Sequence, residues 1–277
     1  MIIDFHTHSH ASDGALAPAE LLEQAAAAGV CRFAITDHDT VAAYAAIDSV
    51  PAGMELVIGT ELSCVWSGVT VHVLGLGIDP QQPMLAAGLA RLKEARNTRA
   101  ELIAERLAAR GMPGALEGAR AIAGVSQIGR PHFATWLVEQ GHVKDLNQAF
   151  DRFLGAGKIG DVKTVWPELA EAVAWILAAG GAAVLAHPFK YKMTRMKLRR
   201  LIVDFQRAGG TVFEVFSGRQ TPEQTTDLCG LAEEYGLLAS AGSDFHAHYQ
   251  YGPGLGVDTS RLPGNVTFWA PAEGAAA

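Results

Sequence analysis

Short apolar runs recur along the chain and predict buried β-strands. In chain order they are MIIDF, CRFAIT, ELVIGTEL, TVHVLGLG, AAVLAHP, TVFEVFSG and LLASAGSDFH, rich in Val, Ile, Leu or Phe. Stretches of helical composition lie between some of them, such as PAELLEQAAAAG and PELAEAVAWILAAG. Strands that alternate with helices predict parallel strands with crossover helices, and this many runs favours a closed barrel over an open sheet. No G-x-G-x-x-G follows the first run, which argues against a dinucleotide-binding sheet.

The strand pattern stops between Pro80 and about Pro167. MLAAGLARLKEARNTRAELIAERLAARG predicts a long helix that ends at Gly111, and shorter helical segments follow at 114–123, 131–141 and 145–154. We therefore expect a barrel domain formed by residues 1–80 and 167–277. The intervening residues 81–166 are expected to form an inserted helical cap over the open end of the barrel.

Composition narrows the partners and the compartment. With 277 residues, 49% hydrophobic and 18% charged, the chain suits one large domain or one domain with an insertion. The net charge of −7 argues against loose binding of long nucleic acid, which needs a surplus of Lys and Arg. The longest uncharged apolar stretch, 172–186, is too short to span a bilayer. No secretory signal is apparent and the 3 cysteines are widely spaced, so a cytoplasmic location without disulfides is expected.

Side chains of the types that bind metal ions lie at or near the ends of most runs. Parallel strands end at one face of a barrel, where functional groups gather. His6 and His8 share one strand face, a pattern that alone leaves metal binding and a structural role open. Ligand-type residues on strand after strand favour a metal centre, with Glu214 only supporting it. The candidate ligands are His6, His8, Asp13, His38, Glu61, His72, His187, Asp244 and His246. Carboxylates beside them either orient imidazoles or cap turns: Asp4, Asp37 and Asp39.

The motifs HTHSHASDG, TDHDT, GTE, VHVLG, AHP and GSDFH, in this order, resemble those of the PHP (polymerase and histidinol phosphatase) family. The resemblance extends from Met1 to about Gly256. It implies a distorted (β/α)7 barrel with two or three divalent metal ions, Mn²⁺ first, with Zn²⁺ or Fe²⁺ as alternatives. It also implies that the candidate ligands bind these ions, with Glu61 as a bridging carboxylate. Asp13 stands where the histidinol-phosphatase branch tends to have histidine, which argues against histidinol phosphate as the substrate.

Within the family, the chain is most similar to stand-alone bacterial phosphoesterases that carry a segment like IGRPHFA. These enzymes remove the 3′-phosphate from nucleoside 3′,5′-bisphosphates, and some trim short RNA from its 5′ end. The resemblance therefore implies a metal-dependent phosphatase that acts on small phosphorylated nucleotides and uses a metal-bound hydroxide. Metal ions suit this chemistry because they lower the pKa of bound water and neutralise phosphoryl charge. Two alternatives stay open: a 5′→3′ exoribonuclease on short RNA, and a non-catalytic metal-bound module.

Arginines on the expected long helix have two possible roles. Arg96 and Arg99 fall on the same face as Leu85, Leu92 and Leu107. An arginine on an apolar face must be paired, reach solvent or face a cavity. If Arg96 and Arg99 are paired or reach solvent, their role is structural. If they face a cavity, they can contact a substrate phosphate.

The segment IGRPHFATW predicts an anion site at the beginning of a helix. Pro131 suits the first helical turn, which leaves Arg130 and His132 beside free backbone N–H groups. We predict that Arg99, Arg130 and His132 bind the second phosphate of the substrate. Lys190 is expected on a solvated helix face, although it is close enough in sequence to the AHP motif to reach the site. The residue that protonates the leaving oxygen is not assigned.

Overall fold

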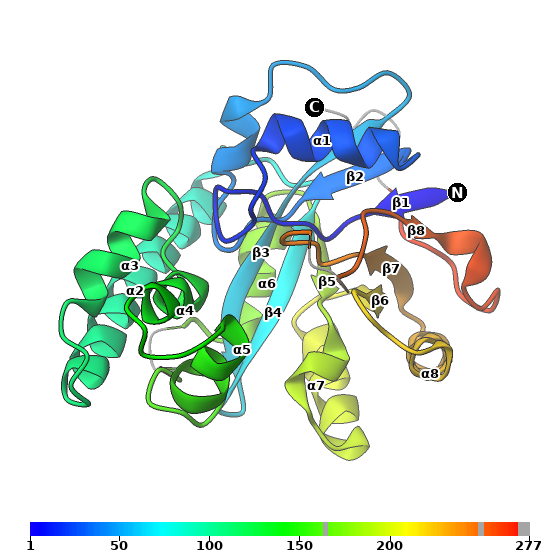
Figure 1. The fold of residues 1–277 in the computed structure, drawn as a ribbon. Helices are drawn as coiled ribbons and strands as arrows, with labels where there is room; N and C mark the ends of the chain where they lie inside the picture. The colour runs from blue at the N-terminus through cyan, green and yellow to red at the C-terminus, as the bar shows by residue number, and fades with distance from the viewer. Residues whose placement is uncertain (163–165, 249–251, 271–277) are drawn as a thin grey trace.

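A mixed sheet of eight strands forms the centre of the molecule (Figure 1). The computed structural model describes residues 1–162, 166–248 and 252–270. The strands are β1 Ile2–Asp4, β2 Arg32–Ile35, β3 Glu55–Trp66, β4 Val69–Leu76, β5 Ala182–Leu185, β6 Val212–Ser217, β7 Leu238–Gly242 and β8 Val257–Asp258. The helices are α1 Pro18–Ala27, α2 Pro83–Ala108, α3 Ala115–Ala123, α4 Arg130–Glu139, α5 Leu146–Ala149, α6 Leu169–Ala178, α7 Arg195–Arg207 and α8 Pro222–Glu234. Short helical turns are η1 Ala42–Ala46, η2 Phe150–Leu154, η3 Pro188–Tyr191 and η4 Thr259–Arg261.

The sheet closes on itself between β7 and β1. The strand order is β7-β6-β5-β4-β3-β2-β1-β8. Phe5 N–H donates to the Ala241 carbonyl at 3.1 Å, and Asp244 N–H donates to the His6 carbonyl at 2.7 Å. β8 pairs antiparallel with β1 outside this closure. The prediction of a distorted (β/α) barrel with inserted helices is therefore confirmed.

The expectation of an entirely parallel barrel is wrong at β4, which runs antiparallel to both β3 and β5. The cause is a two-residue turn between β3 and β4. Ser67 and Gly68 have φ of 47° and 72°, the positive values that the favoured hairpin turns require. As a result, the beginning of β4 lies beside the end of β3. His72 therefore reaches the rim of the barrel from the first half of its strand.

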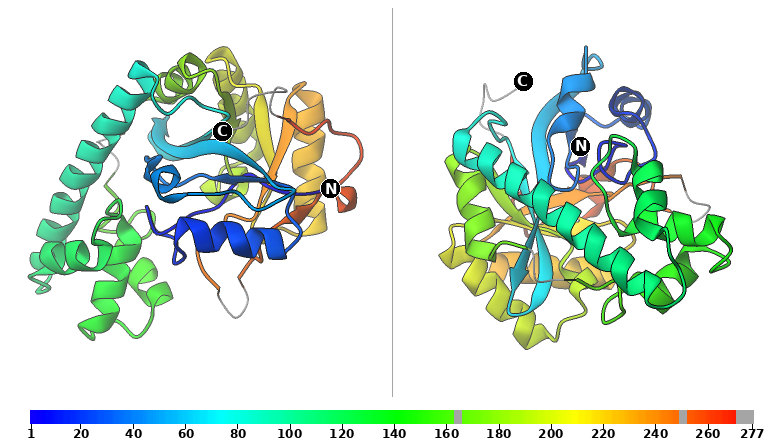
Figure 2. Two further views of the ribbon diagram at one scale, coloured as in Figure 1. Left: turned by 90° about the horizontal axis from the view of Figure 1, so that it is seen from above. Right: turned by 90° about the vertical axis from the view of Figure 1, so that its left-hand side faces the viewer.

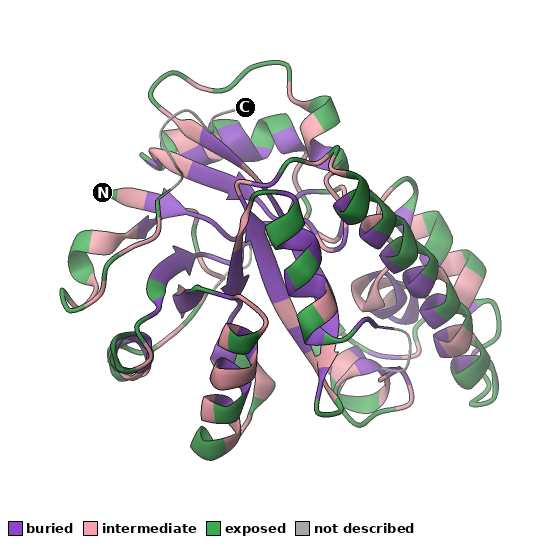
Figure 3. Cartoon of the chain, turned by 180° about the vertical axis from the view of Figure 1, so that it is seen from behind, coloured by how far each residue is buried: buried purple, intermediate pink, exposed green. Residues whose placement is uncertain are grey.

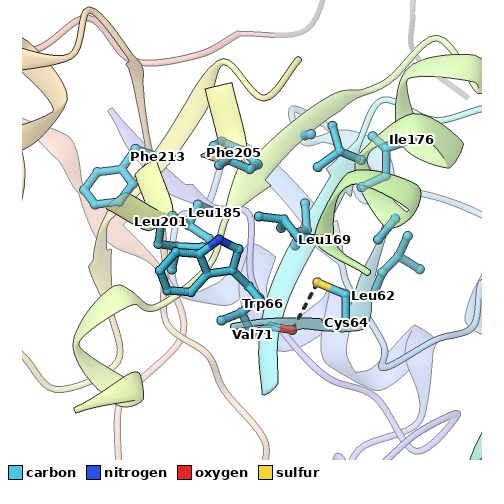
Figure 4. Packing of buried hydrophobic residues seen from close by; sticks show 14 of the residues in the cluster. Leu62, Cys64, Trp66, Val71, Leu169, Ile176, Leu185, Leu201, Phe205 and Phe213 are labelled. Carbon is cyan, nitrogen blue, oxygen red and sulfur yellow. Dashed lines mark hydrogen bonds between the residues drawn. The ribbon is translucent and has the colours of Figure 1, made fainter. Parts of the chain in front are cut away.

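The outer face of the sheet is covered by helices that bury one side each. Figure 3 shows buried and exposed positions alternating along these helices, as expected for amphipathic segments. Figure 4 shows Trp66 of β3 packed in one cluster with Leu169 of α6 and with Leu201 and Phe205 of α7. Burial of such side chains is worth about 1.5–3 kcal/mol each, so this cluster fixes β3 and β4 in place.

The helices from α2 to α5 lie between β4 and β5 in the sequence and beside the barrel in space (Figure 2). They share a hydrophobic cluster of their own, which includes Ile103, Phe133 and Leu137. α3 and α4 approach closely because Gly118 has no side chain: a Cβ there would lie 2.0 Å from Trp136 Cδ1. The exact division into a barrel and a cap of residues 81–166 stays a prediction. Within the described ranges, no helix has both the length and the apolar character needed to cross a membrane.

Candidate metal centre and anion pocket

All of the predicted ligands meet at the rim of the barrel. The structure groups their nitrogen and oxygen atoms within 4.8 Å of one another in three overlapping sets: His8, Asp13, His38 and His246; His6, His8 and Glu61; and His38, Glu61 and His72. His187 and Asp244 adjoin these sets. His187 Nε2 lies 2.8 Å from Glu61 Oε1, and Asp244 Oδ1 lies 3.5 Å from His8 Nε2.

Glu61, in the middle of β3, is the centre of the cluster. Its Oε2 lies 2.9 Å from His38 Nδ1, and other imidazoles contact the same carboxylate: His6 Nε2 at 3.4 Å, His8 Nε2 at 3.3 Å, His72 Nδ1 at 2.8 Å and His187 Nε2 at 2.8 Å. The side chain is buried, which by itself would raise its pKa. The imidazoles outweigh burial and hold the pKa of Glu61 well below its usual value. A buried carboxylate facing several imidazoles can bridge two cations.

Unpaired buried atoms test whether metal ions fit this cluster. In the ligand cluster, several buried atoms lie close to neighbouring ligands but make no hydrogen bond with any described residue: His6 Nε2, His8 Nδ1 and Nε2, His38 Nδ1, Glu61 Oε2 and His187 Nδ1. Such an atom costs about 1–3 kcal/mol when nothing binds it. Histidine and carboxylate ligands without cysteine suit Mn²⁺, Fe²⁺ and Zn²⁺. The residues therefore fit divalent metal ions.

The charges of two ligands are those that a metal site needs. Burial lowers the pKa of His8 well below its usual value, and neighbouring His246 and His38 lower it further, so the ring is neutral. Burial would raise the pKa of Asp13, but His38 and His246 outweigh it and hold this pKa below its usual range. A neutral imidazole and an ionised carboxylate are the forms that bind metal ions.

Glu214 of β6 supports the cluster, as expected from the sequence. Its Oε1 accepts a hydrogen bond from His6 Nδ1 at 2.8 Å, which leaves His6 Nε2 facing Glu61 and Asp244. Its Oε2 accepts from the His187 backbone N–H at 2.5 Å. Burial would lower the pKa of His6, but Glu214 and Glu61 raise it to about 10. Metal binding at Nε2 would therefore release a proton.

The carboxylates beside the ligands anchor backbone and hydroxyl groups. Asp37 accepts from Ser9 N–H at 2.8 Å and from the hydroxyls of Ser9 and Ser12 at 2.6 Å each. Asp4 accepts from the N–H groups of Ser243 and Gly256 at 2.8 Å each. Burial raises the pKa of both Asp4 and Asp37 to about 6 despite these donors. Of the two roles left open by the sequence, these contacts fit the turn-capping role.

Backbone strain is concentrated at the cluster. Asp39, His187 and Asp244 have φ of 55°, 29° and 53°, values in the left-handed region that residues other than glycine seldom adopt. Such positions persist where the surrounding structure enforces them, often at functional sites. Here the strain places two predicted ligands and the partner of Arg96.

The two arginines on the apolar face of α2 have different environments. Arg96 is paired: its Nε and Nη2 both lie 2.6 Å from Asp39 Oδ2. Arg99 is buried above the Trp166 ring, with its guanidinium carbon 5.1 Å from the ring centre. Among the described residues, neither Arg99 Nε nor Trp166 Nε1 has a hydrogen-bond partner. Burial lowers the pKa of Arg99, and neighbouring Arg130 lowers it further.

The structure brings Arg99 and Arg130 together and separates them from His132. Both arginines line two cavities of about 280 and 320 Å³ beside the ligand cluster, and Lys190 lines the same cavities. Trp166 lines the second of them, which we call the arginine cavity. His132 lines a third cavity of about 850 Å³. Its Nδ1 accepts from the Gly129 N–H at 2.9 Å, so this histidine caps α4.

Comparison with known proteins places the chain in a family. Residues 4–113 match the model of the PHP domain. The chain is 44% identical over 264 residues to the 3′,5′-nucleoside bisphosphate phosphatase of Chromobacterium violaceum, covering 94% of this chain and 92% of that protein. The chain belongs to the PHP family. The predicted resemblance is therefore confirmed.

Two further PHP-family comparisons bear on the activity. The chain is 43% identical to a 5′-3′ exoribonuclease of Haemophilus influenzae, covering 88% of this chain and 89% of that protein. It also matches the solved structure of an amidohydrolase from Chromobacterium violaceum that contains bound sulfate and no metal. This match has a TM-score of 0.88 at 43% identity and covers 96% of this chain and 93% of that one.

Two contacts at this PHP site were not predicted from the sequence. Trp166 stands at the end of the insertion, and no local pattern marks it, because its role depends on α2 crossing above it. Lys190 is exposed on the helical turn η3, in agreement with the expected solvated position, and its Nζ nevertheless contacts Asp244 Oδ2. The proximity of Lys190 to His187 in the sequence was the only signal for this contact.

Proposed function

We propose that this PHP-family chain is a metal-dependent phosphatase that removes the 3′-phosphate of nucleoside 3′,5′-bisphosphates, giving a nucleoside 5′-monophosphate and phosphate. One observation carries the proposal. Buried imidazole nitrogens and a carboxylate oxygen without hydrogen-bond partners in the ligand cluster lie beside the cavity into which Arg99 and Trp166, with buried unpartnered N–H groups, also face. The first set calls for cations and the second for an anion, as a phosphate ester held against metal ions requires. The bisphosphate phosphatase at 44% identity and the sulfate in the related structure support this reading.

The candidate ligands would hold two or three divalent ions, with Mn²⁺ expected. When bound, such ions lower the pKa of water toward about 7 and neutralise charge on phosphoryl oxygens. The chain supplies the rest of the arrangement. Glu214 fixes the orientation of His6, and the paired Asp37 and Ser9 hold the turn that carries His8 and Asp13. These residues keep the site in one geometry before substrate binds.

Arg99 and Arg130 would hold the 5′-phosphate. Their guanidinium groups line the same two cavities, and the ring of Trp166 below Arg99 restricts its motion while offering an N–H donor. Charge-assisted hydrogen bonds in a buried site are strong and directional. α2 and α4, which carry these arginines, belong to the predicted cap, so the cap would supply the selectivity for a second phosphate. His132, in the third cavity, has no part in this clamp. The cytoplasmic location expected from the sequence stays part of the proposal.

The test is phosphate release by the purified, Mn²⁺-loaded protein. Adenosine 3′,5′-bisphosphate, AMP, histidinol phosphate and a 5′-phosphorylated RNA tetramer are compared under the same conditions. Fast release from the bisphosphate with little from AMP is expected. Nucleotides released one at a time from the tetramer, with an inert bisphosphate, would favour the exoribonuclease alternative. A metal-loaded protein that turns over none of the substrates would favour the non-catalytic module.

Arg130→Ala tests the phosphate clamp. The variant is expected to lower kcat/KM for adenosine 3′,5′-bisphosphate by about 10–100-fold, the usual value of hydrogen bonds to a charged group. Adenosine 3′-monophosphate, which lacks the 5′-phosphate, should be hydrolysed at the wild-type rate. Arg120→Ala, an exposed arginine on α3, is the matched control. Equal losses on both substrates would contradict a role in binding the second phosphate.

A further inference from the structure

The third cavity has no role in the bisphosphate hydrolysis proposed above. Its volume of about 850 Å³ falls in the range of small-ligand sites, about 300–1,000 Å³. Asp13 and His246 form part of its wall, and both belong to the ligand cluster. The cavity therefore opens directly onto the predicted metal centre.

The third cavity adjoins the arginine cavity, since Asp13, Pro131, Phe150 and His246 line both spaces. The beginning of α4 sends neighbouring residues to opposite sides: Arg130 lines the arginine cavity and His132 lines the third. Of the described residues that line the third cavity, none is Arg99 or Arg130. The ligand cluster thus has one neighbouring space that Arg99 and Arg130 line together and another that neither of them lines.

The two substrate classes differ only on one side of the reacting phosphorus. In a nucleoside 3′,5′-bisphosphate, that phosphorus has one ester bond, to O3′. In RNA it has a second ester bond, to O5′ of the next nucleotide. Hydrolysis of either substrate adds water to phosphorus and breaks the bond to O3′, which takes up a proton. RNA then yields a nucleoside 5′-monophosphate and a chain one nucleotide shorter, which carries the phosphate at its new 5′ end.

Building on the proposed function, we infer that the third cavity binds the nucleotide that follows the reacting phosphate in short RNA. That nucleotide needs space beside the metal centre, away from the arginines that hold the first nucleotide. The third cavity meets both conditions. A single centre then accepts bisphosphates and short RNA, which agrees with relatives of both names at 44% and 43% identity.

The lining suits a ribonucleotide. Phe150 is half-buried and offers an aromatic face, and Leu146 is an exposed apolar residue beside it. Single-stranded nucleic acids bind largely by stacking of bases on such groups. Asn147 and Thr135 offer donors and acceptors to base edges and the ribose 2′-hydroxyl.

The test compares adenosine 3′,5′-bisphosphate (pAp) with the 5′-phosphorylated dinucleotide pApA, which differs only by the second nucleoside. Two variants fill the cavity from different walls: Thr135→Trp on α4 and Asn147→Trp on α5. Because Asn147 is exposed, its substitution does not disturb the hydrophobic core. Each variant should lower the ratio of kcat/KM for pApA to kcat/KM for pAp by about tenfold, the scale of one lost base-stacking contact. Glu139→Trp, exposed on α4 and outside the cavity wall, should leave the ratio unchanged.

The outcomes separate this inference from the proposed function. Equal losses on pAp and pApA would place the nucleoside of the bisphosphate in the third cavity and overturn the inference. An unchanged ratio in both variants, or a wild-type enzyme that cleaves pAp but not pApA, would also overturn it. A wild-type enzyme inert toward pAp would instead refute the proposed function. Calorimetric binding of pAp and pApA to Glu61→Gln, with and without Thr135→Trp, then tests the cavity without turnover.

Discussion

The ligand cluster and the arginine cavity lie side by side and are built in opposite ways. The cluster is held by the strand ends of the barrel and buries acceptor atoms without partners, such as His8 Nε2 and Glu61 Oε2. The arginine cavity is lined on one side by residues of the insertion and on the other by the barrel, and it buries donor atoms without hydrogen-bond partners at Arg99 and Trp166. Each arrangement is unfavourable alone, because buried polar groups need partners. Together they describe a space for cations on one side and an anion on the other.

Arg96 and Asp39 show how a buried arginine in this region is stabilised when it has a carboxylate partner. This buried pair lies at the edge of the arginine cavity: two Arg96 nitrogens contact Asp39 Oδ2, and the Ser63 backbone N–H donates to Asp39 Oδ1 at 2.6 Å. This pairing neutralises the buried charge of Arg96 and fixes the position of its guanidinium group. Arg96 and Arg99, one turn apart on α2, therefore differ in that Arg96 is ion-paired with Asp39 whereas Arg99 Nε has no hydrogen-bond partner among the described residues.

The largest expected effect tests the ligand cluster as the binding site for metal ions. Glu61→Gln should lower kcat for adenosine 3′,5′-bisphosphate by about 10³-fold, since metal ions stabilise such transition states by several kcal/mol. Chelation of the wild-type protein followed by dialysis should have the same effect, and added Mn²⁺ should restore activity. Metal content is measured alongside the rate. Glu55→Gln, on the same strand but paired with Arg32 at the surface, serves as the control. Full activity in the metal-free variant would refute the assignment of the cluster.

A smaller effect is expected for Glu214, which orients His6 through a hydrogen bond to Nδ1 and is not itself a predicted metal ligand. Glu214→Gln should weaken metal affinity by about 10–100-fold, as loss of a carboxylate partner of a metal-bound histidine usually does. Competition with a fluorescent chelator measures the affinity independently of turnover. Glu223→Gln, exposed at the beginning of α8, should leave it unchanged. Normal metal affinity combined with a lower melting temperature would indicate that Glu214 has only a structural role.

The smallest expected effect tests the arginine cavity as the binding site for the anion. Trp166→Phe keeps an aromatic ring beneath Arg99 but removes the indole N–H together with part of the bicyclic ring system. Because a hydrogen bond contributes about 0.5–1.5 kcal/mol, KM for adenosine 3′,5′-bisphosphate should rise about threefold to tenfold. Trp66→Phe removes an indole N–H that donates to Asp204 far from this cavity, and should leave KM unchanged. If Trp166→Phe also leaves KM unchanged, its N–H does not contact the substrate.

The sequence predicted the ligand cluster well because its information is local. Most of the predicted ligands lie at or near the end of an apolar run, and the barrel brings those ends to one rim whatever the details of packing. The inserted helices were predicted for a similar reason, since apolar spacing and glycine stops are local signals. β4 was the exception, because a short turn with two positive φ values reversed its direction and shifted His72 to the first half of its strand.

The sequence alone thus determined the barrel, the inserted helices and the set of ligand-type residues. Only the tertiary structure decided how the charged groups are partnered. It joined Arg96 to Asp39, left Arg99 above Trp166, used His132 to cap α4, and placed Lys190 against Asp244. The physical reason is that a pairing depends on which distant residue lies opposite a side chain. That depends on how α2 and α4 cross the barrel, which no local pattern records.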